Sequence, residues 1–349
     1  MAKKRVAVLH AQVPFGRGGA EYCAENLVKN LRRRGFDAEC VALPFKWYPN
    51  EALLDSYLMW RMADLTEANG EKIDLVIPMM APTFVAKHPN KVLWLMNQHR
   101  AAYDQKDNEL VSGLNTISGG GKVVEAITNM DNITIRESKA IYAHSQNVAD
   151  RLMRYNGIEA APLYHPPALA ERCKSGPFGN YIFFVGRLDK IKRADLLIKA
   201  LPHCDKRIRV KIAGKGQELE PLRELAQELK VQNRVDLLGF VPDEDLPDLY
   251  ANALAVCYPP VDENYEVTLE AFLSQKPVVS CHDSGGVLEF VRDRQSGYIV
   301  DADGEQLGQC FEKLYRNKKM ARDFGREGYE RVKGIRWDNV IDELTKTIR

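Results

Sequence analysis

Residues 181–192 read Tyr-Ile-Phe-Phe-Val-Gly-Arg-Leu-Asp-Lys-Ile-Lys, an apolar run that gives way to glycine and charged residues. The part from Tyr181 to Val185 is continuously apolar, which is typical of a strand buried on both faces. Apolar residues at helical spacing follow from Ala194 to Leu201. A buried strand followed by a helix is the repeating unit of an α/β domain with a parallel sheet.

The same alternation of strand and helix occurs on both sides of this stretch. Short apolar runs with strand character are found at Val6–Leu9, Cys40–Leu43, Leu75–Ile77, Val92–Met96, Ala140–Ala143, Arg209–Ala213, Val235–Leu238, Leu254–Tyr258 and Val278–Cys281. They predict two doubly wound, Rossmann-like parallel sheets, one in each half of the chain. Because ligands of open α/β sheets bind beyond the carboxyl ends of the strands, we expect a ligand cleft between two facing domains.

The chain has 349 residues, which suits two domains of roughly 150 residues better than one. Prolines at positions 162, 166 and 167 and a polar, glycine-bearing stretch over residues 175–179 punctuate the middle of the sequence. We therefore expect an N-terminal domain over residues 1–165 and a C-terminal domain over residues 166–333. The last segment, residues 334–349, has helical spacing and can dock on either domain, including a return to the N-terminal one.

The composition excludes several classes of protein. Lys+Arg number 49 and Asp+Glu 48, so a formal net charge of +1 gives no overall field that favours nucleic acid. The seven cysteines are scattered and form no CxxC pair, which argues against a disulfide framework or a zinc site and suits a reducing cytoplasm. No stretch approaches the roughly 18 apolar residues that cross a bilayer, so neither export nor membrane insertion is expected.

A glycine-rich turn follows the first expected strand. It contains Gly16, Gly18 and Gly19 and precedes a helical run from Tyr22 to Arg34. Glycines before a helix let the backbone approach a phosphate, whose charge the helix N-terminus favours. The GxGxxG spacing of dinucleotide sites is absent, so a flexible turn is an equal alternative and a nicotinamide dehydrogenase is disfavoured.

Charged residues follow two strands of the second half. Arg187 and Lys192 lie at the end of the strand that begins at Tyr181, and a diphosphate needs such positive charge. A pair of solvated surface cations is the alternative. After the strand that ends near residue 258 come the acidic residues Asp262, Glu263, Glu266 and Glu270.

The last of these acidic residues lies in an expected helix. If this helix begins near Val267, Glu270 lies in its first turn, where a carboxylate suits both the helix dipole and sugar hydroxyls. Capping of the helix explains one acidic residue but not the whole cluster.

Two further polar positions are candidates in the loops. His99 lies just past an expected strand and can donate or accept a hydrogen bond near neutral pH, although a packed histidine bonded to backbone is the alternative. Asp243-Glu244-Asp245 has the DxD pattern of a metal site, but it follows Pro242 and precedes apolar residues at helical spacing. That position favours helix capping, and we assign no metal.

In order along the chain, these segments resemble the retaining glycosyltransferases of the GT-B fold, specifically family 4. The resemblance covers most of the chain and rests on Gly18-Gly19-Ala20-Glu21, Gly186-Arg187-Leu188 with Lys192, Ala213-Gly214-Lys215-Gly216, Leu238-Gly239-Phe240-Val241, Thr268-Leu269-Glu270-Ala271 with Lys276-Pro277-Val278, and Ser284-Gly285-Gly286. Each motif alone is common, whereas the ordered set is highly specific.

The resemblance implies roles for individual residues. Arg187 and Lys192 would bind the donor diphosphate, Glu270 the ribose hydroxyls, and His99 the donor sugar. The donor-binding residues that it implies are Gly18, Gly19, Gly186, Arg187, Lys192, Gly239, Phe240, Val241, Asp262, Glu263 and Glu270, and the catalytic ones are His99, Glu263, Arg187 and Lys192. Residues 239–241 would lie beside the base.

The acidic loop departs from the family pattern, which has two glutamates separated by seven residues. Glu263 and Glu270 enclose only six, so either Asp262 takes the first role or the loop is one residue short. We favour Glu263, because this loop resembles a subgroup in which the second acid of the pair contacts the sugar. A further departure is Arg193, which adds a cation beside Lys192 where the family often has glycine.

The resemblance implies a metal-independent, retaining hexosyltransferase with a nucleotide sugar as substrate and no resident cofactor. A saccharide or lipid-linked acceptor on the N-terminal domain, in bacterial polysaccharide or glycoconjugate assembly, would follow the family's habit. A sugar-nucleotide-binding protein that has lost transfer and a GT-B nucleotide-sugar epimerase are the alternatives.

The expected location is the cytoplasm. Basic residues at 29 and 32–34 and an aromatic-rich stretch over residues 45–60 leave open peripheral contact with an anionic membrane at its inner face. A cationic helix end and a partly buried helix are the favoured alternative.

Overall fold

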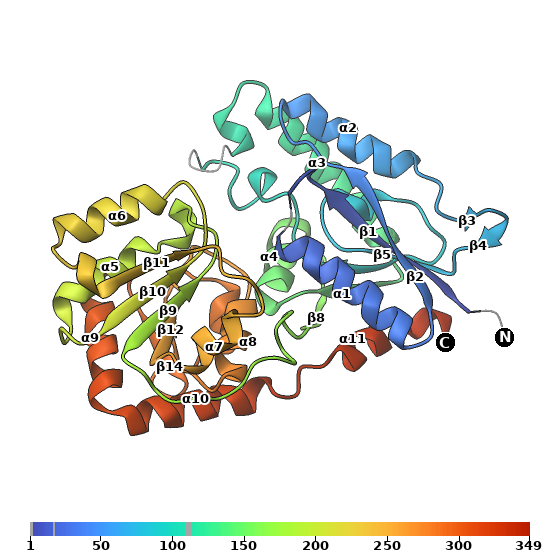
Figure 1. Ribbon diagram of the computed structural model, residues 1–349. Coiled ribbons are helices and arrows are strands. Elements are labelled where there is room, and N and C mark those ends of the chain that lie inside the picture. Colours follow the sequence, from blue (N-terminus) through green and yellow to red (C-terminus); the bar gives the residue numbers. More distant parts are fainter. Residues whose placement is uncertain (1–2, 17, 109–112) are drawn as a thin grey trace. The chain divides into compact units, whose positions relative to one another are not determined.

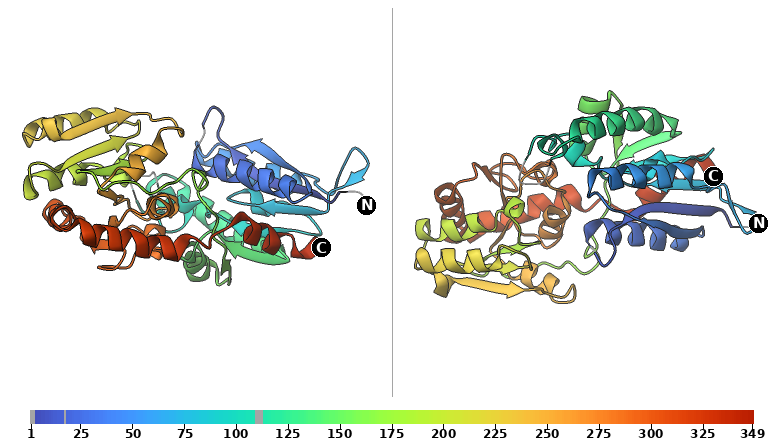
Figure 2. Two further views of the ribbon diagram at one scale, coloured as in Figure 1. Left: turned by 60° about the horizontal axis from the view of Figure 1, so that its bottom comes forward. Right: turned by 90° about the horizontal axis from the view of Figure 1, so that it is seen from above.

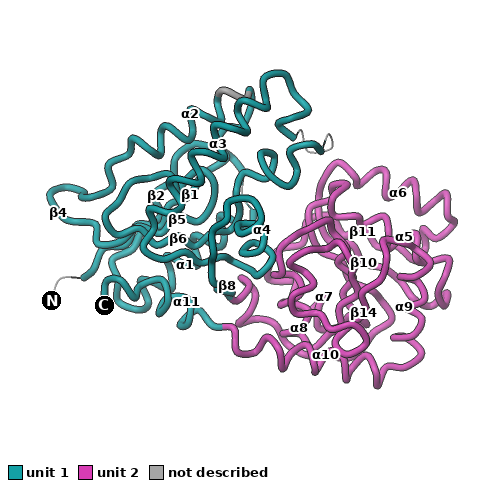
Figure 3. The backbone as a smooth tube through the Cα atoms, turned by 180° about the vertical axis from the view of Figure 1, so that it is seen from behind, with its two compact units in different colours: residues 1–165, 336–349 teal, residues 166–335 magenta. Residues whose placement is uncertain are grey.

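The computed structural model describes residues 3–16, 18–108 and 113–349 (Figure 1). The chain forms two compact units, drawn in different colours in Figure 3. Unit 1 comprises Met1–His165 and Arg336–Arg349, and unit 2 comprises Pro166–Ile335. The chain therefore leaves unit 1 after His165 and returns to it at Arg336.

Unit 2 is a doubly wound α/β domain around one six-stranded sheet. Its strands are all parallel and lie in the order β11-β10-β9-β12-β13-β14. Their bounds are β9 Tyr181–Val185, β10 Arg209–Ala213, β11 Val235–Gly239, β12 Ala255–Cys257, β13 Val278–Cys281 and β14 Gly297–Val300. The strand order reverses between β9 and β12, which makes this pair the topological switch point of the sheet.

Six helices among the described residues cover the sheet of unit 2: α5 Asp195–Ala200, α6 Leu219–Glu228, α7 Leu246–Ala251, α8 Glu266–Leu273, α9 Gly304–Arg316 and α10 Lys318–Val332. The core between sheet and helices is apolar on both faces of the central strand, since Ile182, Phe183 and Phe184 are all 0% exposed. The continuously apolar run at this strand is thus explained by burial on both sides.

Unit 1 contains two three-stranded parallel sheets, where the sequence predicted one continuous sheet. Their orders are β2-β1-β5 and β6-β7-β8, with bounds β1 Arg5–Gln12, β2 Asp37–Pro44, β5 Leu75–Pro78, β6 Val92–Leu95, β7 Ala140–Ala143 and β8 Ala161–Pro162. Isolated bridges at Val76 and Met80 link β5 to β6. The ladder stays incomplete there partly because Pro78, the last residue of β5, has no backbone N–H to donate.

Helices pack on these sheets, with bounds α1 Gly19–Arg33, α2 Asn50–Met62, α3 Gly120–Thr134, α4 Gln146–Asn156 and α11 Trp337–Leu344; a short hairpin, β3 Glu67–Ala68 and β4 Glu71–Lys72, completes the unit.

In the described part of the chain, no helix combines the length and the apolar character that crossing a bilayer requires. None of the seven cysteines forms a disulfide.

The C-terminal helix α11 packs on unit 1 beside α1 (Figure 2). Its buried residues Val340, Ile341 and Leu344 join an apolar cluster that includes residues of α1 and β6. At the surface, Arg34 donates hydrogen bonds to Asp338 at 2.9 Å and to Asp342 at 2.6 Å. The apolar face and the ion pairs together attach the end of the chain to unit 1.

Candidate functional site

The cationic and the acidic motifs of unit 2 leave neighbouring strands at the same edge of the sheet. Strands β9 and β12 pair directly, with Ile182 beside Ala255 and Phe183 beside Val256. The loops that follow them, which begin at Gly186 and Tyr258, therefore emerge side by side at the switch point. Crevices at such points are where open α/β sheets bind ligands.

Lys192 lies at the centre of these loops and is buried, with only 8% of its surface exposed. Its ammonium Nζ lies 2.8 Å from Glu263 Oε1 and donates to the Tyr258 hydroxyl at 3.1 Å. An ammonium has three N–H donors, so one of them has no partner within the residues that the structure describes. Lys192 is not a solvated surface cation, which was one of the two interpretations of its sequence.

The ammonium of Lys192 stays charged despite its burial. Burial alone would lower the pKa of Lys192, but Tyr258 and Glu263 more than offset this effect, and the pKa lies above its ordinary value. The site thus holds a fixed positive charge at neutral pH.

Arg187 is oriented by Asp189 and remains open to solvent. Its Nε donates to Asp189 Oδ2 at 2.7 Å, and 75% of the side chain is exposed. The other carboxylate oxygen of Asp189 accepts from the backbone N–H of Lys192 at 3.1 Å. Asp189 therefore positions both cations, which lie on either side of it in the sequence.

Arg193 has a structural role, where the sequence suggested an additional site cation. Its guanidinium donates to both oxygens of Asp283, at 2.9 and 2.6 Å, and to the carbonyls of Pro259 and Pro260, at 2.6 and 2.9 Å. Through these four hydrogen bonds, Arg193 connects the start of the acidic loop with the segment that follows β13. The positive charge of Arg193 is thereby neutralised within the protein.

The backbone of the acidic loop is held by the same segment after β13. The N–H groups of Asp262 and Glu263 donate to the carbonyls of Asp283 and Ser284, at 2.9 and 3.2 Å. Gly285 has a φ of +62°, and a Cβ at this position would lie 2.1 Å from Asp262 Oδ1. Only glycine fits there. Of the two acids between which the sequence left a choice, Glu263 is the one that contacts Lys192.

Glu270 lies deeper in helix α8 than the sequence predicted. The helix begins at Glu266 rather than at Val267, so Glu266 occupies the first turn and Glu270 is the fifth helical residue. Its Oε2 accepts a hydrogen bond from the Tyr250 hydroxyl at 2.6 Å. Burial raises the pKa of Glu270 to about 8. Without a ligand, the side chain is therefore mostly protonated at pH 7.

The segment Gly239–Val241 ends strand β11 at the same sheet edge. The carbonyl of Gly239 accepts from Gly214 N–H at 2.7 Å. The Phe240 ring is 66% exposed, and the ammonium of Lys215 lies 5.5 Å from its centroid. A surface hollow of about 560 Å³ is lined in part by Phe240 and Val241. An exposed aromatic ring beside backbone amides is a suitable surface for a nucleobase.

In unit 1, His99 begins the 3-10 turn Arg100–Ala102, and its ring lies edge-on to Phe45 with centroids 6.2 Å apart. Burial lowers the pKa of His99 to about 4, so the imidazole is neutral at pH 7. Within the described ranges its ring nitrogens have no hydrogen-bond partner, which differs from the packed, backbone-bonded histidine that the sequence also allowed.

The glycine-rich turn lies before helix α1, with Arg17 outside the described residues. A Cβ at Gly19 would meet nothing within 4 Å, so no packing in the described part of the chain requires glycine there. The N–H of Gly18 donates to Glu21 Oε2 at 2.8 Å. The carboxylate of Glu21 thus accepts a hydrogen bond from one of the backbone N–H groups that a phosphate at this helix end would use.

The sequence did not predict that Tyr258, Asp189 and Tyr250 contact the candidate site residues. Asp189 carried a usable signal, because aspartate before a helical turn is a common N-cap. Tyr258 was recognised only as the end of a strand, and Tyr250 only as an apolar helix position. The DxD segment contributes no side-chain cap, since Asp245 precedes α7 without a capping bond.

Part of the chain is similar in sequence to a known protein family and to known glycosyltransferases. The family model described as Glycosyl transferases group 1 matches residues 174–331. The D-inositol 3-phosphate glycosyltransferase of Salinispora tropica is 32% identical over 184 residues, which are 48% of this chain and 37% of that protein.

The GDP-mannose-dependent alpha-(1-6)-phosphatidylinositol monomannoside mannosyltransferase of Mycobacterium tuberculosis is 30% identical over 199 residues, 53% of this chain and 51% of that protein. The chain thus spans about half the length of these relatives or less.

A solved structure resembles the fold over the whole chain. It is Anabaena HepE in complex with UDP and glucose, with a TM-score of 0.70, 17% sequence identity and 99% of each chain covered. The solved structure shows that the chain has the GT-B fold, and residues 174–331 resemble the family of Glycosyl transferases group 1.

Proposed function

We propose that this protein is a retaining, metal-independent glycosyltransferase that moves a sugar from a nucleoside-diphosphate sugar to a saccharide or lipid-linked acceptor. The observation that carries the proposal is the buried ammonium of Lys192, which keeps one N–H without a partner among the described residues at the switch point of the sheet. A preorganised cation at that place suits a diphosphate. The family match and the UDP complex of the Anabaena structure support the same interpretation.

The chemistry follows from where charge develops. When the bond between the anomeric carbon and the diphosphate oxygen breaks, the sugar becomes positive and the diphosphate takes the electron pair. Lys192 and Arg187 stabilise this growing negative charge, which lowers the barrier more than it strengthens ground-state binding. The acceptor hydroxyl attacks from the same face and gives its proton to the leaving phosphate, so the anomeric configuration is retained and no protein nucleophile is needed.

Glu263 and His99 have separate roles in this proposal. Glu263 fixes Lys192 through their ion pair and uses its second oxygen to accept from the donor sugar. His99, whose neutral ring has no hydrogen-bond partner in the described part of unit 1, is assigned the role of a hydrogen-bonding group for a donor sugar. The pair of Glu270 and Tyr250 receives the ribose hydroxyls, and residues 239–241 lie beside the base.

Donor affinity is expected to rise with pH through the titration of Glu270. Its pKa is about 8 in the free protein, and ribose hydroxyls bind its ionised form more strongly. Binding therefore releases a proton from Glu270, and raising the pH from 7 to 9 should strengthen nucleoside diphosphate binding about three- to tenfold. Calorimetric titration at both pH values measures the change. Glu270→Gln should abolish it, and a wild-type affinity that stays constant or falls over this range would contradict this role.

The aromatic stretch of unit 1 presents exposed apolar side chains that suit a lipid-linked acceptor. In the aromatic stretch and directly after it, Tyr57 and Trp60 are buried, whereas Tyr48 is 61% exposed, Leu58 51% and Met62 83%. The exposed residues could rest on a membrane. The fraction of protein that sediments with anionic liposomes should then decrease when Leu58 and Met62 are replaced with serine. It should also decrease at high salt. If wild type and the serine variant sediment with the liposomes equally, or if wild type does not bind at low salt, this surface does not bind a membrane. The proposed acceptor is then a soluble saccharide.

The function is tested by thermal shift against UDP-, GDP-, TDP- and CMP-sugars, followed by product analysis with the best donor. A donor that binds raises the melting temperature by mass action. Formation of a glycoside with retained configuration supports the proposal. Binding without turnover on any acceptor would indicate a sugar-nucleotide-binding protein, and an isomeric free sugar would indicate an epimerase.

A further inference from the structure

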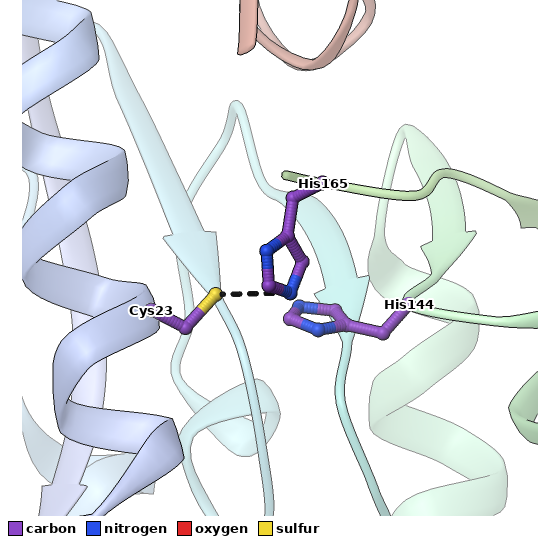
Figure 4. Close-up of side chains that lie close together, drawn as sticks. All are labelled: Cys23, His144 and His165. Atoms are coloured by element: carbon purple, nitrogen blue, oxygen red, sulfur yellow. Dashed lines mark hydrogen bonds between the residues drawn. The ribbon is translucent and has the colours of Figure 1, made fainter. Parts of the chain in front are cut away.

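Three buried side chains of unit 1 that play no part in the proposed reaction converge on one point (Figure 4). They are Cys23 of α1, His144 directly after β7, and His165, the last residue before the chain leaves the unit. Their exposed fractions are 4%, 1% and 3%. Cys23 Sγ lies 3.6 Å from His165 Nε2, and one donor atom from each residue lies within 4.8 Å of the others.

The imidazole of His144 is the unusual member of this cluster. Neither of its ring nitrogens has a hydrogen-bond partner in the described part of the chain, although both are fully buried. A buried polar nitrogen without a partner is costly, and buried polar groups nearly always have one. A neutral imidazole offers one ring nitrogen with a free lone pair, which can bind a metal ion.

Among the described residues around the cluster, no side chain hydrogen-bonds to the His144 ring. The indole of Trp94 lies 4.0 Å from the His144 ring between centroids, but its only N–H donates to the Leu163 carbonyl at 3.0 Å. Trp337, the first residue of α11, stacks on His165 with centroids 5.5 Å apart. An aromatic shell of this kind excludes water and fixes ring orientation, as the outer shells of metal sites do.

We propose that Cys23, His144 and His165 together bind one Zn²⁺ ion. One thiolate and two neutral imidazoles form a donor set that zinc prefers, and no carboxylate joins the cluster among the described residues, which disfavours Ca²⁺ and Mg²⁺. Ligands of tetrahedral zinc lie about 3 to 4 Å from one another. The distance of 3.6 Å from Cys23 Sγ to His165 Nε2 already has this spacing, and zinc binding would require the other pairs of donor atoms, which lie within 4.8 Å, to be as close.

The site has a structural consequence within unit 1. The three ligands come from segments that are far apart in the sequence. The sequence, which has no CxxC pair, therefore predicted no zinc site. A bound ion would join α1, the end of β7 and the exit segment at His165. Because Trp337 stacks on His165, the ion would also support the return of the chain at α11.

The test is titration of the full-length protein with Co²⁺, after metal is removed with a chelator under reducing conditions. We expect one equivalent to bind with an intense near-ultraviolet charge-transfer band from the Cys23 thiolate, and Zn²⁺ to displace it. Cys23→Ser should lose this band, and His144→Gln should weaken Co²⁺ binding at least tenfold. Cys40→Ser, which changes an exposed cysteine of the same unit, should leave the band unchanged.

The contradicting results are equally clear. Absence of stoichiometric Co²⁺ and Zn²⁺ binding by folded wild-type protein would overturn the proposal, and so would a band that persists in Cys23→Ser. If either ligand variant fails to fold, X-ray absorption of the zinc-loaded wild type replaces it. A shell of one sulfur and two imidazole nitrogens supports the site, whereas a shell without sulfur refutes it.

Discussion

Lys192→Ala is expected to lower kcat for sugar transfer on the order of 10²- to 10³-fold, or about 3 kcal/mol in the barrier. The variant removes a buried cation that has one N–H available for the leaving diphosphate. Steady-state kinetics with the preferred donor measure the effect. The melting temperature of the ligand-free protein should fall only slightly, because the remaining Glu263 side chain is 29% exposed and can be solvated.

Lys199→Ala is the matched control for this prediction. Lys199 lies on α5 of the same unit, is about half exposed, and pairs with Asp195 at 2.7 Å. Its loss should change neither kcat nor stability measurably, since exposed ion pairs contribute little. Wild-type kcat in Lys192→Ala, with the fold intact, would show that Lys192 is not the cation that stabilises the leaving group.

Gly285→Ala is expected to have the second largest effect, roughly 10- to 100-fold on kcat/KM, by displacing the acidic loop. A Cβ at this position would lie 2.1 Å from Asp262 Oδ1, and alanine would also be strained at a φ of +62°. The strain alone costs about 1–2 kcal/mol. Relief of the clash moves Asp262 and with it Glu263, the partner of Lys192. Activity and melting temperature, measured together, separate the two effects.

Gly70→Ala provides the control for backbone strain. Gly70 has a φ of +76°, and a Cβ there would meet nothing within 4 Å. Gly70→Ala should therefore lose only the strain contribution, about 1–2 kcal/mol, without losing activity. If Gly285→Ala keeps wild-type kcat/KM, the position of Glu263 does not depend on the contact between Gly285 and Asp262, and the loop geometry is less important than proposed.

The sequence predicted the sheet of unit 2 well because its strands have sharp apolar limits. The bounds of β9, β10 and β13 agree with the predicted runs Tyr181–Val185, Arg209–Ala213 and Val278–Cys281. Strand β14 was missed because it is short and only its first two residues are buried. In unit 1, the split between β5 and β6 depends on pairing between strands, which the pattern of either strand alone does not encode.

The candidate site was only partly predictable, since its chemistry depends on contacts between distant residues. Arg187, Lys192 and Glu270 were predicted as site residues from their positions after strands and in a helix. The hydroxyl that accepts a hydrogen bond from Lys192, however, belongs to Tyr258, 66 residues away in the sequence. Which of Asp262 and Glu263 contacts Lys192 likewise depends on how Asp283 and Ser284 hold the backbone of the loop, and no spacing rule contains that information.

The most direct test of the account is a crystal structure of the protein with the nucleoside diphosphate that stabilises it most. We expect the diphosphate to lie at the switch point between β9 and β12. Its oxygens should be about 3 Å from Lys192 Nζ and within reach of the Arg187 guanidinium. A diphosphate bound elsewhere, with Lys192 still paired only to Glu263 and Tyr258, would contradict it.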